Sequence, residues 1–129
     1  MSKTVIEVYY EDTDCGGVVY YANYLRFFER ARTKHFKERG VDPAEWMEKG
    51  VVFTVTRAEV EYKAPSKYGD TLVVDTDVES RGGARLTFTY KITKENDGAL
   101  IVTGKTEMAC VNDRMRPQRI PDQIMEKIT

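Results

Sequence analysis

The chain has few of the residues on which many protein functions depend. It holds two cysteines, Cys15 and Cys110, and a single histidine, His35, among 129 residues. Two thiols do not make a disulfide framework, so we expect both to be reduced. One histidine excludes most metal sites and histidine-based catalytic clusters unless another chain contributes.

Neither an excess of one charge nor a long apolar run is present. The formal net charge is −1, which gives no electrostatic footprint for nucleic acid or an anionic membrane. The apolar runs are too short to cross a bilayer, and the first residues lack the apolar core of a signal peptide, so we expect a cytoplasmic protein. A length of 129 residues with 41% hydrophobic residues predicts one domain spanning residues 1–129.

One long amphipathic helix is predicted from residue 22 or 23 to residue 39. Gly40 follows as a natural end of this helix, and basic residues in its last two turns suit the negative end of the helix dipole. A second, short helix is predicted after Asp42, with Pro43 at its first position, and it stops at Gly50. The long helix has one buried face, formed by Tyr24, Phe27, Phe28, Ala31 and His35.

Alternating residues predict five strands around this helix. Gly82-Gly83 and Asn96-Asp97-Gly98 predict tight hairpins, and a change of apolar face near Thr56 predicts a bulge. We expect an α+β fold in which an antiparallel meander packs on the helix, followed by a polar, basic tail that ends in a short helical turn. The expected strands are residues 5–10, 51–63, 72–79, 86–93 and 100–111.

The loop of residues 12–17 places an acidic group, Asp14, just before the long helix. The first N–H groups of a helix lack intrahelical partners and carry partial positive charge. A carboxylate beside them forms a candidate hydrolytic site, because these N–H groups can hold a developing oxyanion. The alternative is that Asp12, Thr13 and Asp14 only satisfy the backbone of a turn.

Other patterns resemble functional motifs without matching them. Residues 98–106 resemble a phosphate-binding loop, but five residues rather than four separate the two glycines. Asp12 and Asp14 resemble the start of a calcium loop whose twelfth position, Asn23, lacks the bidentate glutamate.

The remaining reactive side chains favour structural roles. Cys15 has no base or cation near it in sequence, which favours a small loop residue over a nucleophile. His35 lies on the apolar stripe, which favours a core histidine over a catalyst. Basic residues flank the turns and the tail and could together hold phosphates: Lys63, Lys67, Arg81, Arg85, Arg114, Arg116 and Arg119.

Residues 10–24, Tyr-Glu-Asp-Thr-Asp-Cys-Gly-Gly-Val-Val-Tyr-Tyr-Ala-Asn-Tyr, resemble the signature of the 4-hydroxybenzoyl-CoA thioesterase family. The similarity is greatest to the bacterial acyl-CoA thioesterase branch linked to the Tol–Pal system, and residues 28–33 prolong it. It continues weakly through residues 60–65 and Gly69-Asp70, and so covers nearly the whole chain. The resemblance implies the family's hotdog fold, a long helix wrapped by an antiparallel sheet, in agreement with the predicted order of elements.

The resemblance also implies a thioester hydrolase that uses no metal or organic cofactor. Asp14 matches the family's catalytic carboxylate, which acts either as nucleophile or as general base. Tyr21 matches the position whose backbone N–H polarises the thioester carbonyl, where many members of the branch have histidine. Gly17, Val18 and Tyr24, in the same signature, are the expected substrate contacts.

The implied substrate is acyl-CoA, with acyl carrier protein as an alternative carrier. Similar hotdog proteins form dimers with a continuous sheet and often homotetramers, with active sites between subunits. We expect no nucleic acid partner and no membrane insertion. Two other functions remain open: a hotdog dehydratase, which needs a histidine beside an acidic residue, and a non-catalytic acyl-CoA-binding or scaffold module, which would bind without turnover.

Overall fold

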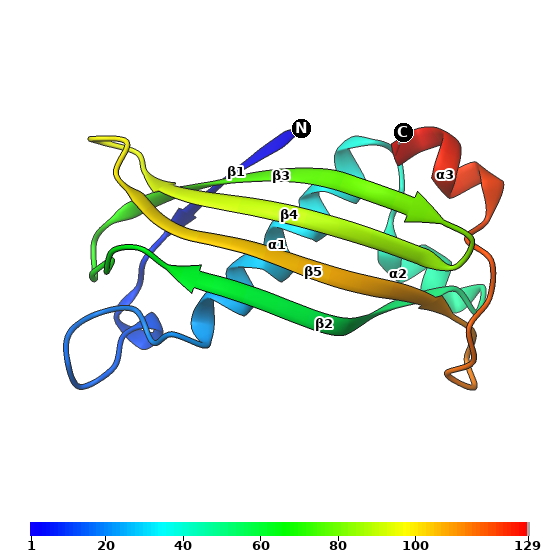
Figure 1. The fold of residues 1–129 in the computed structure, drawn as a ribbon, viewed down its shortest axis with the longest axis horizontal. Coiled ribbons are helices and arrows are strands. Elements are labelled where there is room, and N and C mark those ends of the chain that lie inside the picture. The colour runs from blue at the N-terminus through cyan, green and yellow to red at the C-terminus, as the bar shows by residue number, and fades with distance from the viewer. Residues whose placement is uncertain (129) are drawn as a thin grey trace.

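The computed structural model describes residues 1–128, apart from the side chains of residues 80 and 81. A five-stranded antiparallel sheet covers one long helix, which runs behind the sheet in Figure 1. The elements are β1 (Ser2–Glu7), the 3₁₀ turn η1 (Tyr10–Asp12), α1 (Asn23–Glu38), α2 (Pro43–Glu48), β2 (Val52–Tyr62), β3 (Thr71–Gly82), β4 (Arg85–Lys94), β5 (Leu100–Val111) and α3 (Asp122–Ile128).

The strands lie in the order β1-β3-β4-β5-β2, so the expected simple meander is wrong. Only β3, β4 and β5 follow one another as hairpin neighbours, while β1 pairs with β3 and β2 pairs with β5. The two glycine-containing turn signals of the sequence fall at the two true hairpins. The segment between β2 and β3 has no such two-residue turn and contains Pro65. It crosses from β2, at one edge of the sheet, to β3, which lies next to the opposite edge strand β1.

The first strand begins and ends three residues earlier than predicted, at Ser2–Glu7. The reason lies in the residues that follow it: the Tyr9 N–H donates to the Asp12 carboxylate at 2.8 Å, which turns the chain into η1. The predicted bulge in the second strand is confirmed, because the register of β2 against β5 shifts between Val55 and Arg57.

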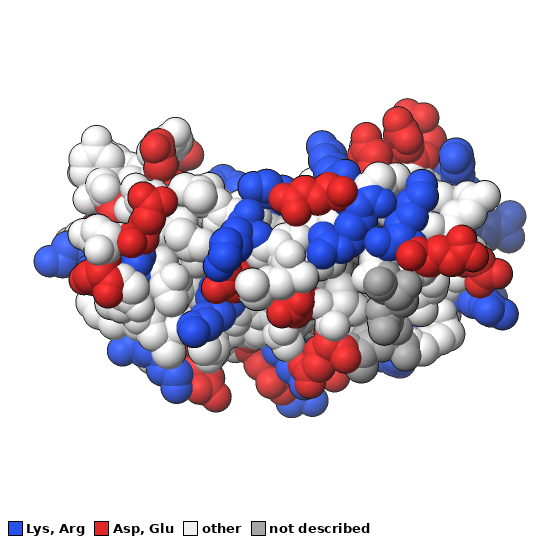
Figure 2. Space-filling model, turned by 90° about the horizontal axis from the view of Figure 1, so that it is seen from above, with Lys and Arg blue, Asp and Glu red and all other residues white. Residues whose placement is uncertain are grey.

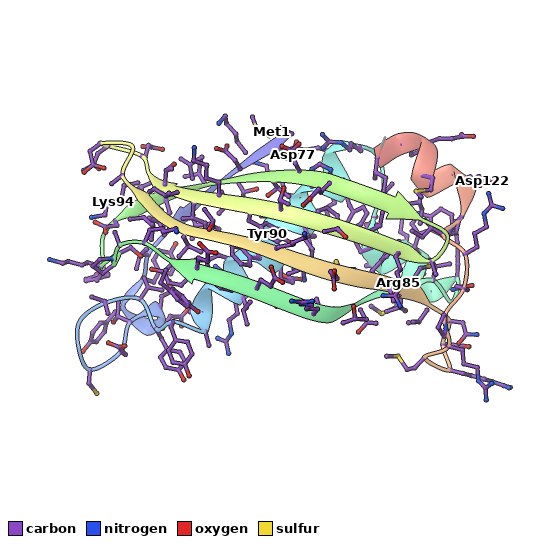
Figure 3. The ribbon with its side chains drawn as sticks, viewed as in Figure 1. Met1, Asp77, Arg85, Tyr90, Lys94 and Asp122 are labelled. Atoms are coloured by element: carbon purple, nitrogen blue, oxygen red, sulfur yellow. The ribbon has the colours of Figure 1, made fainter. Side chains whose placement is uncertain are left out.

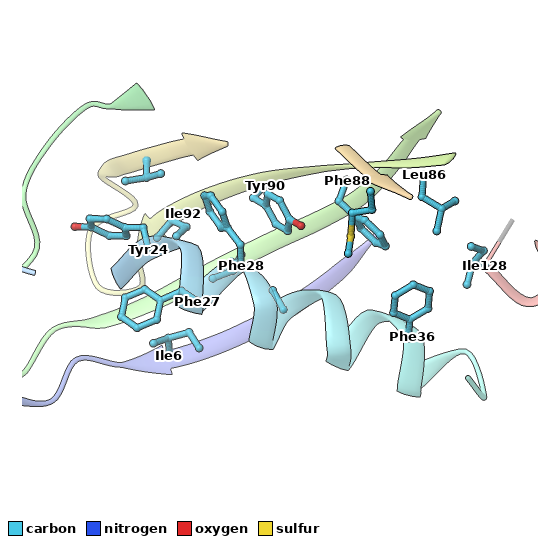
Figure 4. Packing of buried hydrophobic residues seen from close by; sticks show 14 of the residues in the cluster. Ile6, Tyr24, Phe27, Phe28, Phe36, Leu86, Phe88, Tyr90, Ile92 and Ile128 are labelled. Carbon is cyan, nitrogen blue, oxygen red and sulfur yellow. The ribbon is translucent and has the colours of Figure 1, made fainter. Parts of the chain in front are cut away.

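The core lies between α1 and the inner face of the sheet (Figure 4), and every residue of the predicted helical stripe is buried. The Phe28 ring stacks on Tyr90, with 4.2 Å between ring centroids. Gly104 on β5 gives this pair room, because a side chain there would overlap the Phe28 ring. The facing residues of the sheet include Leu72, Val74, Leu86, Phe88, Tyr90 and Ile92.

Strand β2 forms one edge of the sheet and is largely exposed, although its alternation predicts an apolar face. Val55 is 43% exposed and Tyr62 is 49% exposed. The cause is the strand order, because the strands that lie closest to α1 are β1 and β3, whereas β2 lies at the opposite edge of the sheet.

The two short helices, α2 and α3, lie at one end of the sheet. The Ala44 N–H donates to the Asp42 carboxylate at 3.0 Å, which confirms the predicted start of α2. The tail ends in α3, whose Ile124 and Ile128 are buried in the core. Among the described residues, no helix is long and apolar enough to cross a membrane.

Candidate active site

Residues 13–19 form a narrow loop that presents Asp14 to solvent. Thr13 and Val19 are bridged across its base, and the Asp14 N–H donates to the Val18 carbonyl at 2.9 Å. Gly17 turns the chain with a φ of 80°, a backbone conformation that favours glycine. Backbone bonds therefore hold the base of the loop, and Asp14 lies exposed beyond it.

The Asp14 carboxylate has one oxygen in use. Its Oδ1 accepts the Gly16 N–H at 2.8 Å, and no other group of the described chain donates to the carboxylate. Asp14 is exposed, so its second oxygen faces solvent. No group of three histidine, cysteine or acidic side chains suited to a metal ion occurs within residues 1–128.

Asp12 has a different environment from Asp14, two residues away. It is 6% exposed, and its carboxylate accepts both the Asn23 side-chain amide and the Tyr9 N–H at 2.8 Å. Its backbone carbonyl accepts the Tyr20 N–H at 2.9 Å. The alternative in which Asp12, Thr13 and Asp14 satisfy the backbone of a turn holds for Asp12, which also ties the loop to the start of α1. It holds as well for the Thr13 hydroxyl, which donates to the Tyr10 carbonyl at 2.7 Å, and for one oxygen of Asp14.

The residues before α1 present unpaired donors. The Asn23 N–H donates to the Tyr20 carbonyl at 2.8 Å, which forms a turn that leads into the helix. Within the described part of the chain, the N–H groups of Tyr21 and Ala22 have no acceptor. The Tyr62 hydroxyl donates to the Tyr21 carbonyl at 2.9 Å. This bond fixes the peptide group between Tyr21 and Ala22.

Asp14 and the beginning of α1 meet in one open depression of about 350 Å³. Tyr20 and Arg26 also line it. The pKa of Tyr20 is raised, chiefly by its neighbour Tyr21 and also by the negative charge of Asp14. The depression therefore joins an exposed carboxylate, the unpaired Ala22 N–H and a cation, from residues twelve positions apart. Glu11 also lines it, whereas Tyr21 is not among its lining residues.

The three expected substrate contacts lie in different environments. Gly17 is exposed, and Val18 is half-buried beside Lys67, with which it forms a bridge. Tyr24 is 3% exposed, and its hydroxyl shares a 2.7 Å hydrogen bond with Ser66. Burial raises the pKa of Tyr24. Substrate binding by these residues stays a prediction, and Tyr24 offers almost no exposed surface in this structure.

Exposed tyrosines form a surface beside Asp14 that the sequence does not identify as a unit. The rings of Tyr20 and Tyr21 lie 4.8 Å apart, and Tyr62 meets Tyr21 edge-on at 6.3 Å. Tyr62 lies at the end of β2, some forty residues later in the chain. The alternating pattern placed it on a strand but did not indicate that it lies beside Tyr21.

His35 is a core residue. It is 2% exposed, its Nδ1 lies 2.8 Å from the Ser2 hydroxyl, and its ring meets Phe88 edge-on. Burial lowers the pKa of His35 to about 4. It stands twelve residues beyond the start of α1 and therefore about 18 Å along the helix from the Asp14 end. No histidine–carboxylate pair of the dehydratase kind forms among the described residues.

The basic residues named in the sequence divide between the two ends of the molecule. Lys67 lies beside the Asp14 loop, and Lys63 is paired with Glu61 at 2.8 Å. Arg85 lies at the opposite end of the sheet (Figure 3), where the turn after β5 carries Arg114, Arg116 and Arg119. The Arg81 side chain lies outside the described residues. Figure 2 shows positive and negative side chains interspersed over one face of the molecule.

The fold is that of the hotdog thioesterases, and an aspartate loop precedes its long helix. The chain belongs to the thioesterase-like superfamily, whose family model matches residues 8–128. It is 37% identical over 121 residues to the acyl-CoA thioester hydrolase YbgC of Escherichia coli, covering 93% of this chain and 90% of that protein. The resemblance inferred from residues 10–24 is thereby confirmed.

Two further relatives agree. The putative acyl-CoA thioesterase YneP of Bacillus subtilis is 37% identical over 112 residues, covering 87% of this chain and 80% of YneP. The crystal structure of a DHNA-CoA thioesterase from Staphylococcus aureus superposes with a TM-score of 0.91 at 34% identity, covering 98% of this chain and 89% of the other.

Proposed function

We propose that the chain hydrolyses acyl-CoA thioesters to a carboxylic acid and coenzyme A, with Asp14 as the catalytic carboxylate. The observation that carries this proposal is the uncommitted oxygen of Asp14 in the same depression as the first residues of α1. The activities named for YbgC and YneP support the substrate class. Acyl carrier protein remains an alternative carrier.

In this proposal the thioester carbonyl accepts a hydrogen bond from the Tyr21 N–H, which has no acceptor within the described chain. Negative charge that develops on that oxygen is stabilised by this donor and by the dipole of α1. Asp14 either removes a proton from the attacking water or attacks the carbonyl carbon itself. Gly17 and Val18, next to Asp14 in the loop, are the proposed substrate contacts together with Tyr24.

A second copy of the chain completes the site in this proposal, as a dimer or a tetramer. Strand β2 leaves its outer edge unpaired within the described chain, and edge strands without protection pair readily. Antiparallel pairing of two β2 edges would bring the basic turn after β5 of one copy toward the Asp14 end of the other. That turn is the proposed site for the coenzyme A phosphates. Sedimentation analysis that shows only monomers would contradict this assembly.

The experiment that tests the chemistry measures thiol release from short, long and aromatic acyl-CoAs by the native protein and by Asp14→Asn. The substitution keeps an oxygen that can accept the Gly16 N–H, so the loop is preserved. Turnover is expected to fall by about two orders of magnitude or more. The matched control is Asp97→Asn, since Asp97 accepts the N–H two residues ahead in the same way, at 2.9 Å, in a hairpin outside the depression.

The alternative function, a non-catalytic acyl-CoA-binding or scaffold module, predicts a different result. Such a module would bind an acyl-CoA while releasing no thiol from any member of the panel. Hydrolysis that survives Asp14→Asn would support the thioesterase function but reject Asp14 as the catalytic group.

A further inference from the structure

Arg32 is a buried charged side chain on α1 that lacks an acidic partner. It is 9% exposed, and none of the ion pairs formed by the described residues includes it. Its one hydrogen bond to a described group runs from Nη1 to the Tyr90 hydroxyl at 3.2 Å. A guanidinium carries five N–H donors, and burying an unpaired charge is costly. Most of the hydrogen-bonding capacity of Arg32 is therefore unused.

The unused donors border a cavity of about 200 Å³ between α1, α2 and the start of β2. Arg32 lines this cavity, and no nitrogen of its side chain is both fully enclosed and unpaired, so its remaining donors are open to a ligand. The Tyr90 hydroxyl also bonds Thr106 at 2.6 Å and cannot supply a negative charge, because burial raises its pKa. The walls are mostly apolar and include Phe36, Met47, Phe53 and Met108.

One acidic side chain, Glu29, also lines the cavity. It is exposed, and its carboxylate accepts a hydrogen bond from Thr33 at 3.4 Å. It forms no ion pair with Arg32 in the described structure. Water solvates Glu29 at the rim, so the buried guanidinium is not neutralised from within the chain.

We propose that this cavity, the Arg32 pocket, binds the carboxylate of a molecule with an apolar chain. A carboxylate accepts two parallel hydrogen bonds from a guanidinium, and the chain would pack on the phenylalanine and methionine walls. Two sources share this chemistry. One is a carboxylate at the far end of the acyl group of a thioester substrate, which rests on the proposed function. The other is a free fatty acid.

Both the Arg32 pocket and the Asp14 depression are lined by residues of α1, and β2 runs beside this helix between them. Near the start of α1, Tyr62 of β2 lies 5.8 Å from Tyr24. Near its end, Phe53 of β2 stacks on Phe36 at 5.3 Å. Arg32 stands nine residues beyond the first residue of α1, a distance of about 13 Å along the helix. An acyl group whose thioester lies at the start of α1 must span this length to reach Arg32, whereas a free fatty acid has no such requirement.

Calorimetric titration with decanoate and with decanol tests the pocket itself. The native protein is expected to bind decanoate at least about tenfold more tightly than decanol, because only the carboxylate pairs with Arg32. Arg32→Met should abolish this preference, and Arg32→Lys should reduce it. The matched control is Arg30→Met, since Arg30 lies over the Phe27 ring, 5.8 Å from its centroid, and outside the pocket.

Kinetics with dodecanoyl-CoA and with its ω-carboxylated counterpart separate the two sources. A preference for the ω-carboxylated substrate that Arg32→Met removes through KM, with kcat retained, identifies the acyl terminus. Decanoate binding without that preference identifies the free acid.

Equal binding of decanoate and decanol by the native protein overturns the proposal, even where Arg32→Met does not fold. The proposal is also overturned if the native protein shows no carboxylate preference and Arg32→Met changes the mass of the oligomer. In that case a second copy of the chain supplies the negative charge that pairs with Arg32. Failure of thioester hydrolysis with carboxylate binding intact rejects the proposed function and the first source, but not the pocket.

Discussion

The Asn23 side-chain amide donates a 2.8 Å hydrogen bond to the buried carboxylate of Asp12. This bond joins the loop that carries Asp14 to the first residue of α1, which lies next to the N–H groups proposed to bind the thioester oxygen. The relative position of the Asp14 carboxylate and these donors therefore depends on Asp12, which is buried and does not line the depression.

Replacing Asp12 should disturb catalysis through this contact. Asp12→Ala leaves the Asn23 amide and the Tyr9 N–H without their acceptor, and we expect a loss of about 2 kcal/mol in the free energy of unfolding. We also expect kcat to fall at least about tenfold, because misplacing reacting groups is costly. Thiol-release kinetics and denaturant titration measure the two effects.

Asp12→Asn is the informative control. Its oxygen can still accept the Tyr9 N–H, and its amide can donate to Asn23 once the Asn23 side chain turns over. We expect kcat within about threefold of the native value, because the hydrogen bonds persist although the charge is lost. An equal fall in kcat in both variants would show that catalysis depends on the negative charge of Asp12 and not on its hydrogen bonds.

Stability should fall as the pH drops through the range in which His35 titrates in the unfolded chain. The folded protein holds the pKa of His35 at about 4, below the ordinary 6.5, because the ring is buried and lies near Arg39 and the N-terminal amine, against weaker opposing effects of Asp77 and Glu38. Between about pH 6.5 and pH 4 the unfolded state therefore binds a proton that the folded state does not.

The expected loss over this range is at most about 3 kcal/mol. Unfolding in denaturant, measured at steps of pH, tests it. His35→Gln has no proton to bind and should flatten the dependence. A slope that the variant leaves unchanged would assign the effect to other groups.

Gly104→Ala should destabilise the fold by about 2–3 kcal/mol, because its methyl group would overlap the Phe28 ring, which is itself stacked on Tyr90. Gly82→Ala is the matched control, since the space around Gly82 is open. Thermal unfolding of both variants measures the difference. Similar melting temperatures would mean that the ring moves aside at little cost.

Tyr62→Phe should lower kcat several-fold while leaving stability within about 1 kcal/mol of the native value. The hydroxyl that it removes donates to the Tyr21 carbonyl and holds the peptide next to the proposed oxyanion donors. Tyr68→Phe is the control, because Tyr68 is 66% exposed and its hydroxyl makes no hydrogen bond to a described group. Equal kcat in the two variants would separate Tyr62 from catalysis.

Local patterns predicted the elements of this fold well. The helical stripe from Tyr24 to His35, the cap at Asp42 and the bulge near Thr56 each depend on neighbours within a few residues, and the structure has all three. The strand order was predicted wrongly, because pairing of β1 with β3 and of β2 with β5 depends on contacts between distant segments. The exposure of β2 follows from that order and was missed for the same reason.

In the candidate site, too, contacts between sequence neighbours could be predicted and contacts between distant segments could not. The loop with Asp14 and the helix that follows it are adjacent in sequence, so their proximity could be predicted. Tyr62 could not be placed beside Tyr21 without the strand order. The different environments of Asp12 and Asp14 depend on which carboxylate turns inward, and no spacing rule decides that. Arg32 carried no signal, because a single arginine in a basic helix ordinarily faces water.

The pairing of early strands with late ones has a consequence for how the chain folds as it is synthesised. β1 has no partner until β3 has left the ribosome, and β2 has none until β5, which ends at Val111, has followed. The helix stripe stays uncovered until the same moment, since the central strands shield it. We therefore expect the nascent chain to stay open until nearly its full length has emerged, and then to close in one cooperative step.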